Sequence, residues 1–352
     1  MLLEENKPLA PLTTFGIGGP ARWFVEAASE DQIVDATAYA RERGAALFVL
    51  GGGSNLLVSD TGFDGLVLRV GLRGITAVDA PGEPGHTIYR VAAGEDWNRF
   101  VQRTVEDKCA GLECLAGIPG TVGGTPVQNV GAYGQEVASA IKQVRAYDLQ
   151  QHEFVEYTAA ECGFAYRRSR FNSADRGRFI VTRVDYRLTP GGAPTLRYAE
   201  LQRAFPEGVQ PSLAEVAAQV CRIRQAKGML IVEGDPDCLS AGSFFKNPVV
   251  TDKQFRQIAS AGAKAPPRFP ASPDKENQGH VKVPAAWLIE QAGFDKGYAL
   301  GAAAISSRHT LALVNRGGAS AAEILALANQ ITAAVEERFG ICLEMEPVKL
   351  GF

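Results

Sequence analysis

The sequence predicts an α+β fold with a mixed N-terminal region and a helix-rich C-terminal region. Helical and strand-like segments do not alternate regularly along the 352 residues, which argues against a simple doubly wound sheet. Residues 143–191 alternate between apolar and polar side chains with near period two, as expected for antiparallel hairpins with one packed face. Two alanine-rich amphipathic segments, 212–228 and 320–340, predict long helices.

Local signals place the elements of the N-terminal region. Residues 29–44 predict a helix, because Ser29 can cap its first turn and Gly44 can end it. Residues 96–111 predict a second helix, with Asp96 as its cap and a glycine at its end. Short apolar or alternating runs predict strands at 45–53, 65–71, 86–95, 144–159 and 178–190.

A change of composition near residues 195–212 divides the chain. Before it lie the mixed helices and hairpins, and after it the alanine-rich helices. A chain of this length is expected to hold two domains. We therefore predict one domain at 1–205, subdivided near 70–80, and a second at 206–352.

Composition excludes several classes of function. The net charge is −3 and the basic residues are scattered, so a nucleic-acid surface is not expected. No apolar run approaches the roughly 18 residues of a membrane span, and the acidic N-terminus with Pro8 and Pro11 does not resemble an export signal. The six cysteines lack CxxC spacing and the four histidines lack metal spacing, which favours reduced thiols in a cytoplasmic protein without a metal site.

Two glycine-rich stretches suggest a bound anion. "LGGGSNLLV" at 50–58 places three glycines directly after a predicted strand, where the backbone could either make a tight turn or cradle a phosphate. It matches neither the P-loop nor the GxGxxG pattern. "LAGIPGTVGGTPVQNVGAYG" at 115–134 is long and poor in bulky side chains, and ordered loops of this kind are usually functional. Two such loops favour a large phosphate-bearing ligand held mainly by backbone.

Five motifs in this order resemble the UDP-N-acetylenolpyruvoylglucosamine reductase family of flavoenzymes, and the likeness extends from about residue 9 to 351. They are "LTTFGIGGPA" (12–21), "VLGGGSNLLV" (49–58), "GIPGTVGGTPVQNVGAYG" (117–134), "YRRSRF" (166–171) and "AGSFFKNP" (241–248).

The resemblance implies an FAD-binding region of the vanillyl-alcohol-oxidase (PCMH) type, made of two subdomains over 1–205, and a substrate-binding domain over 206–352. It implies that both glycine loops face the FAD pyrophosphate. Because "GGGSN" contains no His or Cys, we expect FAD to be bound noncovalently. The implied cofactor-binding residues are Gly51, Gly52, Gly53, Ser54, Asn55, Leu56, Ile118, Pro119, Gly120, Thr121, Gly123, Gly124, Gln128, Asn129, Gly131 and Ala132.

The implied reaction is the NADPH-dependent reduction of UDP-N-acetylglucosamine enolpyruvate to UDP-N-acetylmuramate, a cytoplasmic step of peptidoglycan synthesis. Hydride passes from the flavin to the β-carbon, and negative charge then spreads from the α-carbon into the carboxylate. By resemblance, Ser243 donates the proton to the α-carbon, and Arg167 and Glu346 stabilise the enolate.

The residues alone leave other interpretations open. Arg167 lies in a basic cluster that could simply be surface, and Ser243 could be a turn serine after Gly242. Either Glu344 or Glu346 could be a solvated strand residue, and alignment with the family ending selects the second. The sequence departs from the family pattern at two positions, with Arg168 where an acidic residue is usual and Pro347 where a branched aliphatic residue is usual.

Substrate contacts are also implied by the resemblance. Tyr198 matches a loop tyrosine that reaches the UDP diphosphate in the longer family subtype, and Tyr133 is expected to line the site. Lys227 and Asn247 match diphosphate and uracil-side positions, although Lys227 could equally be a solvated helix end.

Two other functions remain as alternatives. One is a flavin oxidase or dehydrogenase of the same fold that acts on an alcohol or sugar, and the other is a nucleotide-sugar binding protein without flavin. Under the leading interpretation, the partners are the UDP-sugar and NADPH, and the protein is expected to be a monomer.

Overall fold

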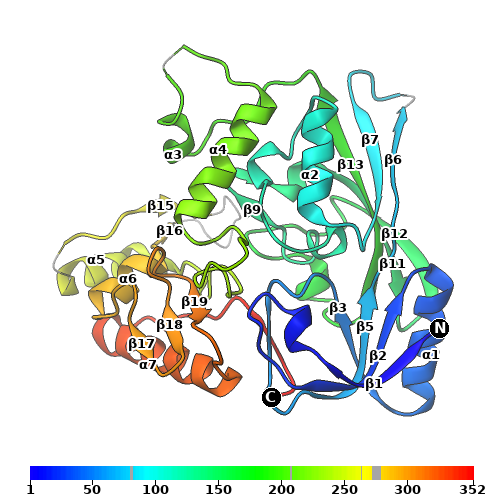
Figure 1. Cartoon of the computed structure of the whole chain (residues 1–352). Coiled ribbons are helices and arrows are strands. Elements are labelled where there is room, and N and C mark those ends of the chain that lie inside the picture. Colours follow the sequence, from blue (N-terminus) through cyan, green and yellow to red (C-terminus); the bar gives the residue numbers. More distant parts are fainter. Residues whose placement is uncertain (80–81, 207, 263, 272–278) are drawn as a thin grey trace. The chain divides into compact units, whose positions relative to one another are not determined.

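The computed structural model describes residues 1–79, 82–206, 208–262, 264–271 and 279–352, and these form two compact units. Both units contain helices and strands (Figure 1), which confirms the α+β class. The first unit comprises Met1–Lys7, Ala21–Gly52 and Asp64–Gln225, and the second comprises Pro8–Pro20, Gly53–Phe63 and Ala226–Phe352.

The first unit begins with a small sheet in the order β1-β2-β5-β3. Its neighbours β3 and β5 run parallel, as the intervening crossover requires. Helix α1 packs its apolar stripe of Ile33, Ala36 and Ala40 into the same core as Leu66 and Leu68 of β5. The elements are β1 (Leu3–Pro8), β2 (Pro20–Ala27), α1 (Glu30–Glu42), β3 (Ala46–Leu50) and β5 (Phe63–Val70).

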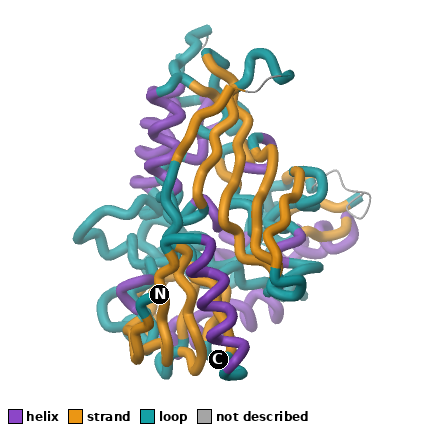
Figure 2. Tube along the Cα trace, turned by 90° about the vertical axis from the view of Figure 1, so that its right-hand side faces the viewer, coloured by secondary structure: helices purple, strands orange, loops and turns teal. Residues whose placement is uncertain are grey.

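A larger antiparallel sheet follows in the order β12-β11-β13-β7-β6, and β8 pairs with the end of β13. Its long strands lie side by side in Figure 2. Trp97 and Phe100 of α2 lie against Tyr186 of β13, with ring centroids 5.9 and 5.0 Å from that of the tyrosine. The elements are β6 (Ile75–Asp79), β7 (Thr87–Ala92), α2 (Trp97–Glu106), β8 (Cys109–Ala110), β11 (Ile141–Asp148), β12 (Glu153–Thr158) and β13 (Phe179–Pro190).

Short elements complete this unit around the larger sheet. Helix α4 (Leu213–Ala226) buries Val216, Val220 and Ile223 in the unit's core. The remaining elements are η2 (Glu113–Leu115), η3 (Val122–Gly124), β9 (Gly131–Ala132), β10 (Gln135–Glu136), η4 (Val137–Ser139), η5 (Arg170–Asn172) and α3 (Ala199–Gln202).

The predicted helix starts are confirmed, but one predicted helix end is wrong. The Ser29 side chain accepts the Gln32 N–H, and the Asp96 side chain accepts the Arg99 N–H. Helix α2 ends at Glu106 instead of near 111, because the next residues leave the helix to form β8, which pairs with β13. This strand pairing is long-range and leaves no mark in the helix-forming pattern.

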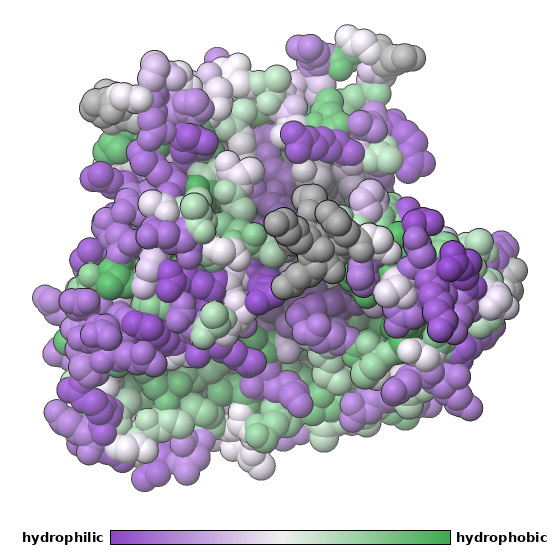
Figure 3. Space-filling model, turned by 180° about the vertical axis from the view of Figure 1, so that it is seen from behind, coloured by the Kyte–Doolittle hydropathy of each residue, from purple (hydrophilic) through white to green (hydrophobic). Residues whose placement is uncertain are grey.

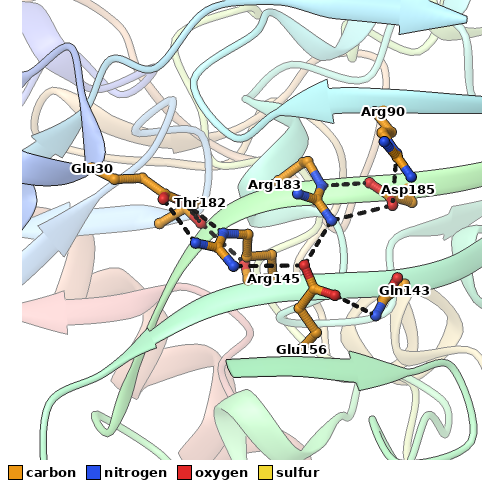
Figure 4. A network of polar contacts seen from close by, with 8 residues as sticks. All are labelled: Glu30, Arg90, Gln143, Arg145, Glu156, Thr182, Arg183 and Asp185. Carbon is orange, nitrogen blue, oxygen red and sulfur yellow. Dashed lines mark hydrogen bonds and ion pairs between the residues drawn. The ribbon is translucent and has the colours of Figure 1, made fainter. Parts of the chain in front are cut away.

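A charged network connects α1 to the larger sheet (Figure 4). Glu30 accepts hydrogen bonds from Arg145 Nε at 2.9 Å and from Thr182 Oγ1 at 2.7 Å. The chain of ion pairs continues through Glu156 and Arg183, across neighbouring strands of the sheet. Burial acts to raise the pKa of Glu30, but the hydrogen bonds from Arg145 and Thr182 outweigh it and hold this pKa below its usual value.

Replacing Glu30 by glutamine is expected to lower the free energy of unfolding by about 1–2 kcal/mol at pH 7, since charge-assisted hydrogen bonds are lost at a half-buried site. Because the pKa of Glu30 is lower in the folded than in the unfolded state, the ionised side chain stabilises the fold above the unfolded pKa of about 4.3. This stabilisation is lost as pH falls through the folded pKa. The difference between wild type and Glu30→Gln should therefore shrink below about pH 4.

Urea titrations at pH 7 and near pH 3 measure this difference. Asp31→Asn is the matched control, because Asp31 is exposed in the same first turn of α1. It loses only the interaction with the helix dipole, about 0.5 kcal/mol. Equal destabilisation by both substitutions at pH 7 would contradict a stabilising role for the network.

The second unit is built on a core of helices and short sheets. Its longest helix, α7 (Ala321–Phe339), confirms the helix predicted at 320–340; it begins with a capping box at Ser320 and Glu323 and ends at Gly340 with a φ of +66°. The other elements are η1 (Ala10–Leu12), β4 (Leu56–Val58), β14 (Val249–Thr251), α5 (Asp252–Ala261), β15 (Phe269–Pro270), β16 (His280–Lys282), α6 (Ala285–Gln291), β17 (Ala299–Leu300), β18 (Ala303–Ile305), β19 (Leu313–Asn315) and β20 (Val348–Leu350).

Two segments from the N-terminal part of the chain belong to this second unit. Phe15 packs edge-on against Phe244 at a centroid distance of 6.3 Å, and its carbonyl accepts a hydrogen bond from Asn315 Nδ2. Asp60 accepts the N–H groups of Ala321 and Ala322 at the start of α7. Strand β4 pairs in parallel with β20. Residues 8–20 and 53–63 are therefore held by the C-terminal part of the chain.

The compact units do not follow the division expected from composition. Helix α4 begins after residue 205 but belongs to the first unit, and the chain enters the second unit for good at Ala226. The reason is the apolar face of α4, which packs into the first unit's core. Within that unit, the small sheet ends at Val70 and the larger sheet begins at Ile75.

The surface and the helix lengths agree with the composition. Hydrophilic side chains dominate the face seen in Figure 3, with hydrophobic ones scattered between them. Among the residues described, no helix combines the length and the apolar character that crossing a membrane requires. In the same part of the chain, no cluster of three or more His, Cys, Asp or Glu side chains could hold a metal ion.

Candidate functional site

The two glycine-rich loops meet backbone to backbone within the first unit. A Cβ atom on Gly52 would lie 2.5 Å from Gly120 Cα, and one on Gly51 would lie 2.9 Å from Thr121 Oγ1. Real Cβ atoms do not approach backbone this closely, so glycine is required at position 52 for steric reasons. The two loops begin about 65 residues apart in the sequence, yet they form one structural feature.

Part of this feature is available to an anion. The second loop is anchored through the Val122 and Gly123 N–H groups, which donate to Glu95 and Ala93 carbonyls at 2.9 and 2.8 Å. The N–H groups of Gly52, Gly120 and Thr121 make no hydrogen bond with the described residues. Successive backbone N–H groups in a turn can bind an anion. These three N–H groups are therefore candidates for contacts with a phosphate group.

Replacing Gly52 by alanine is expected to weaken binding of the FAD that the sequence motifs imply about tenfold, equivalent to about 1.4 kcal/mol, because the added Cβ forces the two loops apart. The ratio of flavin to protein absorbance after purification measures the bound fraction. Ser139→Ala is the control, since Ser139 is exposed just after the second loop and its hydroxyl donates to the Glu136 carbonyl in its own turn. Equal loss of FAD in both variants would contradict the steric argument.

The remaining cofactor-binding candidates of the second loop differ in how they are used. Asn129 is only 1% exposed, and its amide donates to Glu136 and to the Ala165 carbonyl and accepts from the Ala138 N–H. Its side chain therefore shapes the loop. Gly131 and Ala132 form β9, which pairs with β10. Ile118, Pro119 and Gln128 are half-buried on the same loop.

Arg167 extends from a strained backbone position next to this loop. Its φ is +54°, in the left-handed region that residues with a side chain seldom adopt. Its Nη1 donates to the Gly131 carbonyl at 3.0 Å, and its own carbonyl accepts from Asn172 Nδ2 at 3.1 Å. Arg167 is half-buried, whereas the neighbouring Arg168 is exposed. A half-buried guanidinium beside the second glycine loop is suited to bind a carboxylate.

Tyr133 and Tyr198 also lie together in the first unit. Their ring centroids are 5.4 Å apart in an edge-to-face arrangement. Tyr133 has a φ of +49° near the end of the second loop, and Tyr198 is 42% exposed just before α3. Sequence reasoning missed their neighbour Arg224, a buried cation whose position on the apolar stripe of α4 was the available signal.

The second unit brings Ser243 and Glu346 onto adjacent segments. The Glu346 N–H donates to the Phe244 carbonyl at 2.9 Å, and the Phe244 N–H donates to the Leu311 carbonyl at 2.7 Å. Ser243 is half-buried, and its hydroxyl makes no hydrogen bond with the described residues. The hydroxyl can therefore serve a bound molecule.

The structure distinguishes the two glutamates of the C-terminal ending. Glu344 is exposed and forms an ion pair with Lys246, whereas Glu346 is half-buried. Asn55 Nδ2 donates to the Glu346 carbonyl at 3.4 Å, and Val348 N–H donates to the Asn55 carbonyl at 3.0 Å. The first glycine loop therefore continues, at Gly53, Ser54, Asn55 and Leu56, into contact with the segment that carries Glu346. On either side of Pro347, which has no N–H to donate, the Glu346 and Val348 N–H groups donate to the Phe244 and Asn55 carbonyls.

The last two candidates lie at helix ends. Asn247 Oδ1 accepts the N–H of Ala285 at 2.9 Å, at the start of α6. Lys227 is half-buried and directly follows α4. The candidates are thus distributed over both units: Arg167, Tyr133 and Tyr198 belong to the first, and Lys227, Ser243, Asn247 and Glu346 to the second.

Two family profiles match this sequence, one in each part of the chain. The "FAD binding domain" profile matches residues 21–151, which include both glycine loops. The profile "UDP-N-acetylenolpyruvoylglucosamine reductase, C-terminal domain" matches residues 235–350, which include Ser243, Asn247 and Glu346.

Similar full-length proteins carry the same description. The UDP-N-acetylenolpyruvoylglucosamine reductase of Streptomyces coelicolor is 46% identical over 99% of this chain and 90% of its own length. That of Thermobifida fusca is 44% identical over 99% of this chain and 98% of its own length. The crystal structure of the Thermus caldophilus reductase superposes with a TM-score of 0.67 at 28% identity, covering 99% of this chain and all of that one.

Proposed function

Because the chain belongs to the UDP-N-acetylenolpyruvoylglucosamine reductase family, we propose that it reduces UDP-N-acetylglucosamine enolpyruvate to UDP-N-acetylmuramate with NADPH. Family membership confirms the resemblance seen in the five motifs, and with it an FAD-containing oxidoreductase. The full-length identity to the Streptomyces coelicolor protein carries the proposal, since it spans both the FAD-binding and the C-terminal parts.

The proposed cofactor site is the meeting point of the glycine loops. The open N–H groups of Gly52, Gly120 and Thr121 would hold the pyrophosphate, and the absence of side chains at Gly51 and Gly52 admits it. When bound, FAD supplies the hydride that is added to the β-carbon of the enol ether.

The protein's own residues handle the charge and the proton. Arg167 binds the substrate carboxylate and stabilises the negative charge that develops there, with Glu346 assisting. Ser243 donates a proton to the α-carbon through its hydroxyl, which has no competing protein partner among the described residues. Because serine is a weak acid, the hydroxyl must regain its proton from solvent or from a neighbouring group in the same step.

The remainder of the substrate is recognised by polar side chains. Tyr198 and Lys227 contact the diphosphate, and Tyr133 lines the site next to Tyr198. Asn247 presents its amide NH₂ to the uracil side, since its Oδ1 is already used by α6. Because NADPH and nucleotide sugars are cytoplasmic metabolites, we place the reaction in the cytoplasm as a step of peptidoglycan synthesis.

Flavin absorbance tests this function directly. The purified protein should show flavin bands that bleach with NADPH and return under anaerobic conditions when UDP-N-acetylglucosamine enolpyruvate is added. UDP-N-acetylglucosamine, which lacks the double bond, should not restore the bands. Bleaching by an alcohol or free sugar without NADPH would indicate an oxidase or dehydrogenase instead. Colourless protein that takes up no FAD would indicate a binding protein.

A further inference from the structure

Arg224 is a buried cation in the last turn of α4. It is only 6% exposed and lies beside Val220 and Ile223 on the apolar stripe that packs into the first unit's core. Burying a guanidinium costs free energy unless its donors are well used. An exposed arginine two residues earlier on the same helix, Arg222, shows that a basic side chain here could have stayed in water.

The contacts of Arg224 reach both ends of the second glycine loop. Its Nε donates to the carbonyl of Gly117, at the start of the loop, at 3.0 Å. Its guanidinium also hydrogen-bonds the hydroxyl of Tyr133, near the end of the loop. Gly117 is held from its other side by Asn98 Oδ1, which accepts its N–H at 2.7 Å. One side chain thus joins two loop residues that lie 16 positions apart.

Tyr133 transmits this constraint toward Tyr198. The left-handed φ of Tyr133 fixes its backbone, and the hydrogen bond to Arg224 fixes the far end of its ring. Burial raises the pKa of Tyr133 to about 12, so the phenol stays protonated at neutral pH. The rings of Tyr133 and Tyr198 then lie edge to face, with their centroids 5.4 Å apart. The next residue, Gly134, lies close to the segment that carries Tyr198, since a Cβ on Gly134 would lie 2.9 Å from Arg197 Cβ.

We propose that Arg224 is a positioning residue that couples the cofactor loop to recognition of the substrate diphosphate. It holds Tyr133 at a defined distance from Gly117, and Tyr133 in turn presents Tyr198. This inference rests on the proposed function through the role of Tyr198. Lysine cannot replace Arg224, because a single ammonium lacks the planar set of donors that serves the carbonyl and the phenol together.

Arg224→Lys is expected to raise the KM for UDP-N-acetylglucosamine enolpyruvate about tenfold, as for one charge-assisted hydrogen bond, and to change kcat less than about threefold. Tyr133→Phe, which keeps the ring and removes the hydroxyl, should raise KM by a similar factor. The KM of the double variant should exceed that of either single variant by no more than about twofold, because both substitutions remove the same interaction between Arg224 and Tyr133. Arg222→Lys, on the exposed face of α4, is the matched control and should leave KM unchanged.

Three results would overturn the proposal. They are an unchanged KM in Arg224→Lys, multiplication of the two effects in the double variant, and an equal rise of KM in Arg222→Lys. If Arg224→Lys fails to fold, an unchanged KM in Tyr133→Phe overturns it and a raised KM supports it.

Calorimetric titration with UDP-N-acetylglucosamine, which carries the diphosphate, separates this inference from the proposed function. A Kd raised about tenfold by Arg224→Lys supports the positioning role even if the wild type shows no turnover. If the wild type and Arg224→Lys both turn over and have the same Kd, the proposed function stands and the positioning role of Arg224 is rejected.

Discussion

Replacing Ser243 by alanine is expected to slow reoxidation of the flavin by UDP-N-acetylglucosamine enolpyruvate about 10²- to 10⁴-fold, the usual contribution of a positioned general acid. Reduction of the flavin by NADPH should change less than about threefold, because no proton reaches the substrate carbon in that half-reaction. Stopped-flow absorbance measures the two half-reactions separately.

The geometry makes this separation a sharp test. Ser243 directly precedes Phe244, whose carbonyl accepts the Glu346 N–H and whose N–H donates to Leu311, so the backbone of the segment is anchored independently of the Ser243 hydroxyl. The substitution therefore removes the proposed proton donor without removing a structural hydrogen bond of the described residues. Ser260→Ala is the control, since that serine is exposed on α5 and its hydroxyl donates to the Gln257 carbonyl in its own turn. Equal slowing of both half-reactions by Ser243→Ala would show that Ser243 is not the acid.

Replacing Arg167 by glutamine is expected to lower kcat about 10²- to 10³-fold, as for the loss of one preorganised group that stabilises developing negative charge. The effect should fall on the reoxidation half-reaction, because the enolate forms there. Single-turnover kinetics with the pre-reduced enzyme measure it.

The neighbouring arginine supplies the control for this prediction. Arg168 is exposed, and Arg168→Gln removes the same charge from the same segment, so kcat should stay within about threefold of the wild type. Glutamine at 167 must adopt the same left-handed backbone, hence the strain is retained and only the guanidinium is lost. Comparable losses in the two variants would assign the effect to local charge and would remove Arg167 from the reaction.

Much of the secondary structure could be predicted from short stretches of sequence. Ser29 and Asp96 each cap the helix they were expected to begin, and Gly340 ends α7 in the left-handed conformation. Such signals work because a cap depends on a side chain and an N–H group only two or three residues away. The hairpin of β11 and β12 was predictable for the same reason, as its pairing is local.

Long-range pairing could not be predicted in this way. The end of α2 moved because residues 109–110 join β13, which lies about 80 residues later. The partners of individual loop residues were out of reach for a similar reason. Asn129 stays a predicted cofactor contact, while its side-chain amide bonds to Glu136, Ala165 and Ala138. Arg224 was missed in the sequence, because its contacts with Gly117 and Tyr133 join residues far apart in the chain.

The motifs of the sequence were sufficient to identify the family, the FAD cofactor and the residue types of the proposed chemistry, because these depend on which side chains are present and in what order. Tertiary structure decided which segments act together. It joined Gly52 to Gly120 in one unit and assigned residues 53–63 to the other, where Asn55 contacts the segment of Glu346. These associations depend on packing and hydrogen bonds between residues tens to hundreds of positions apart, and no local pattern in the chain encodes such partners.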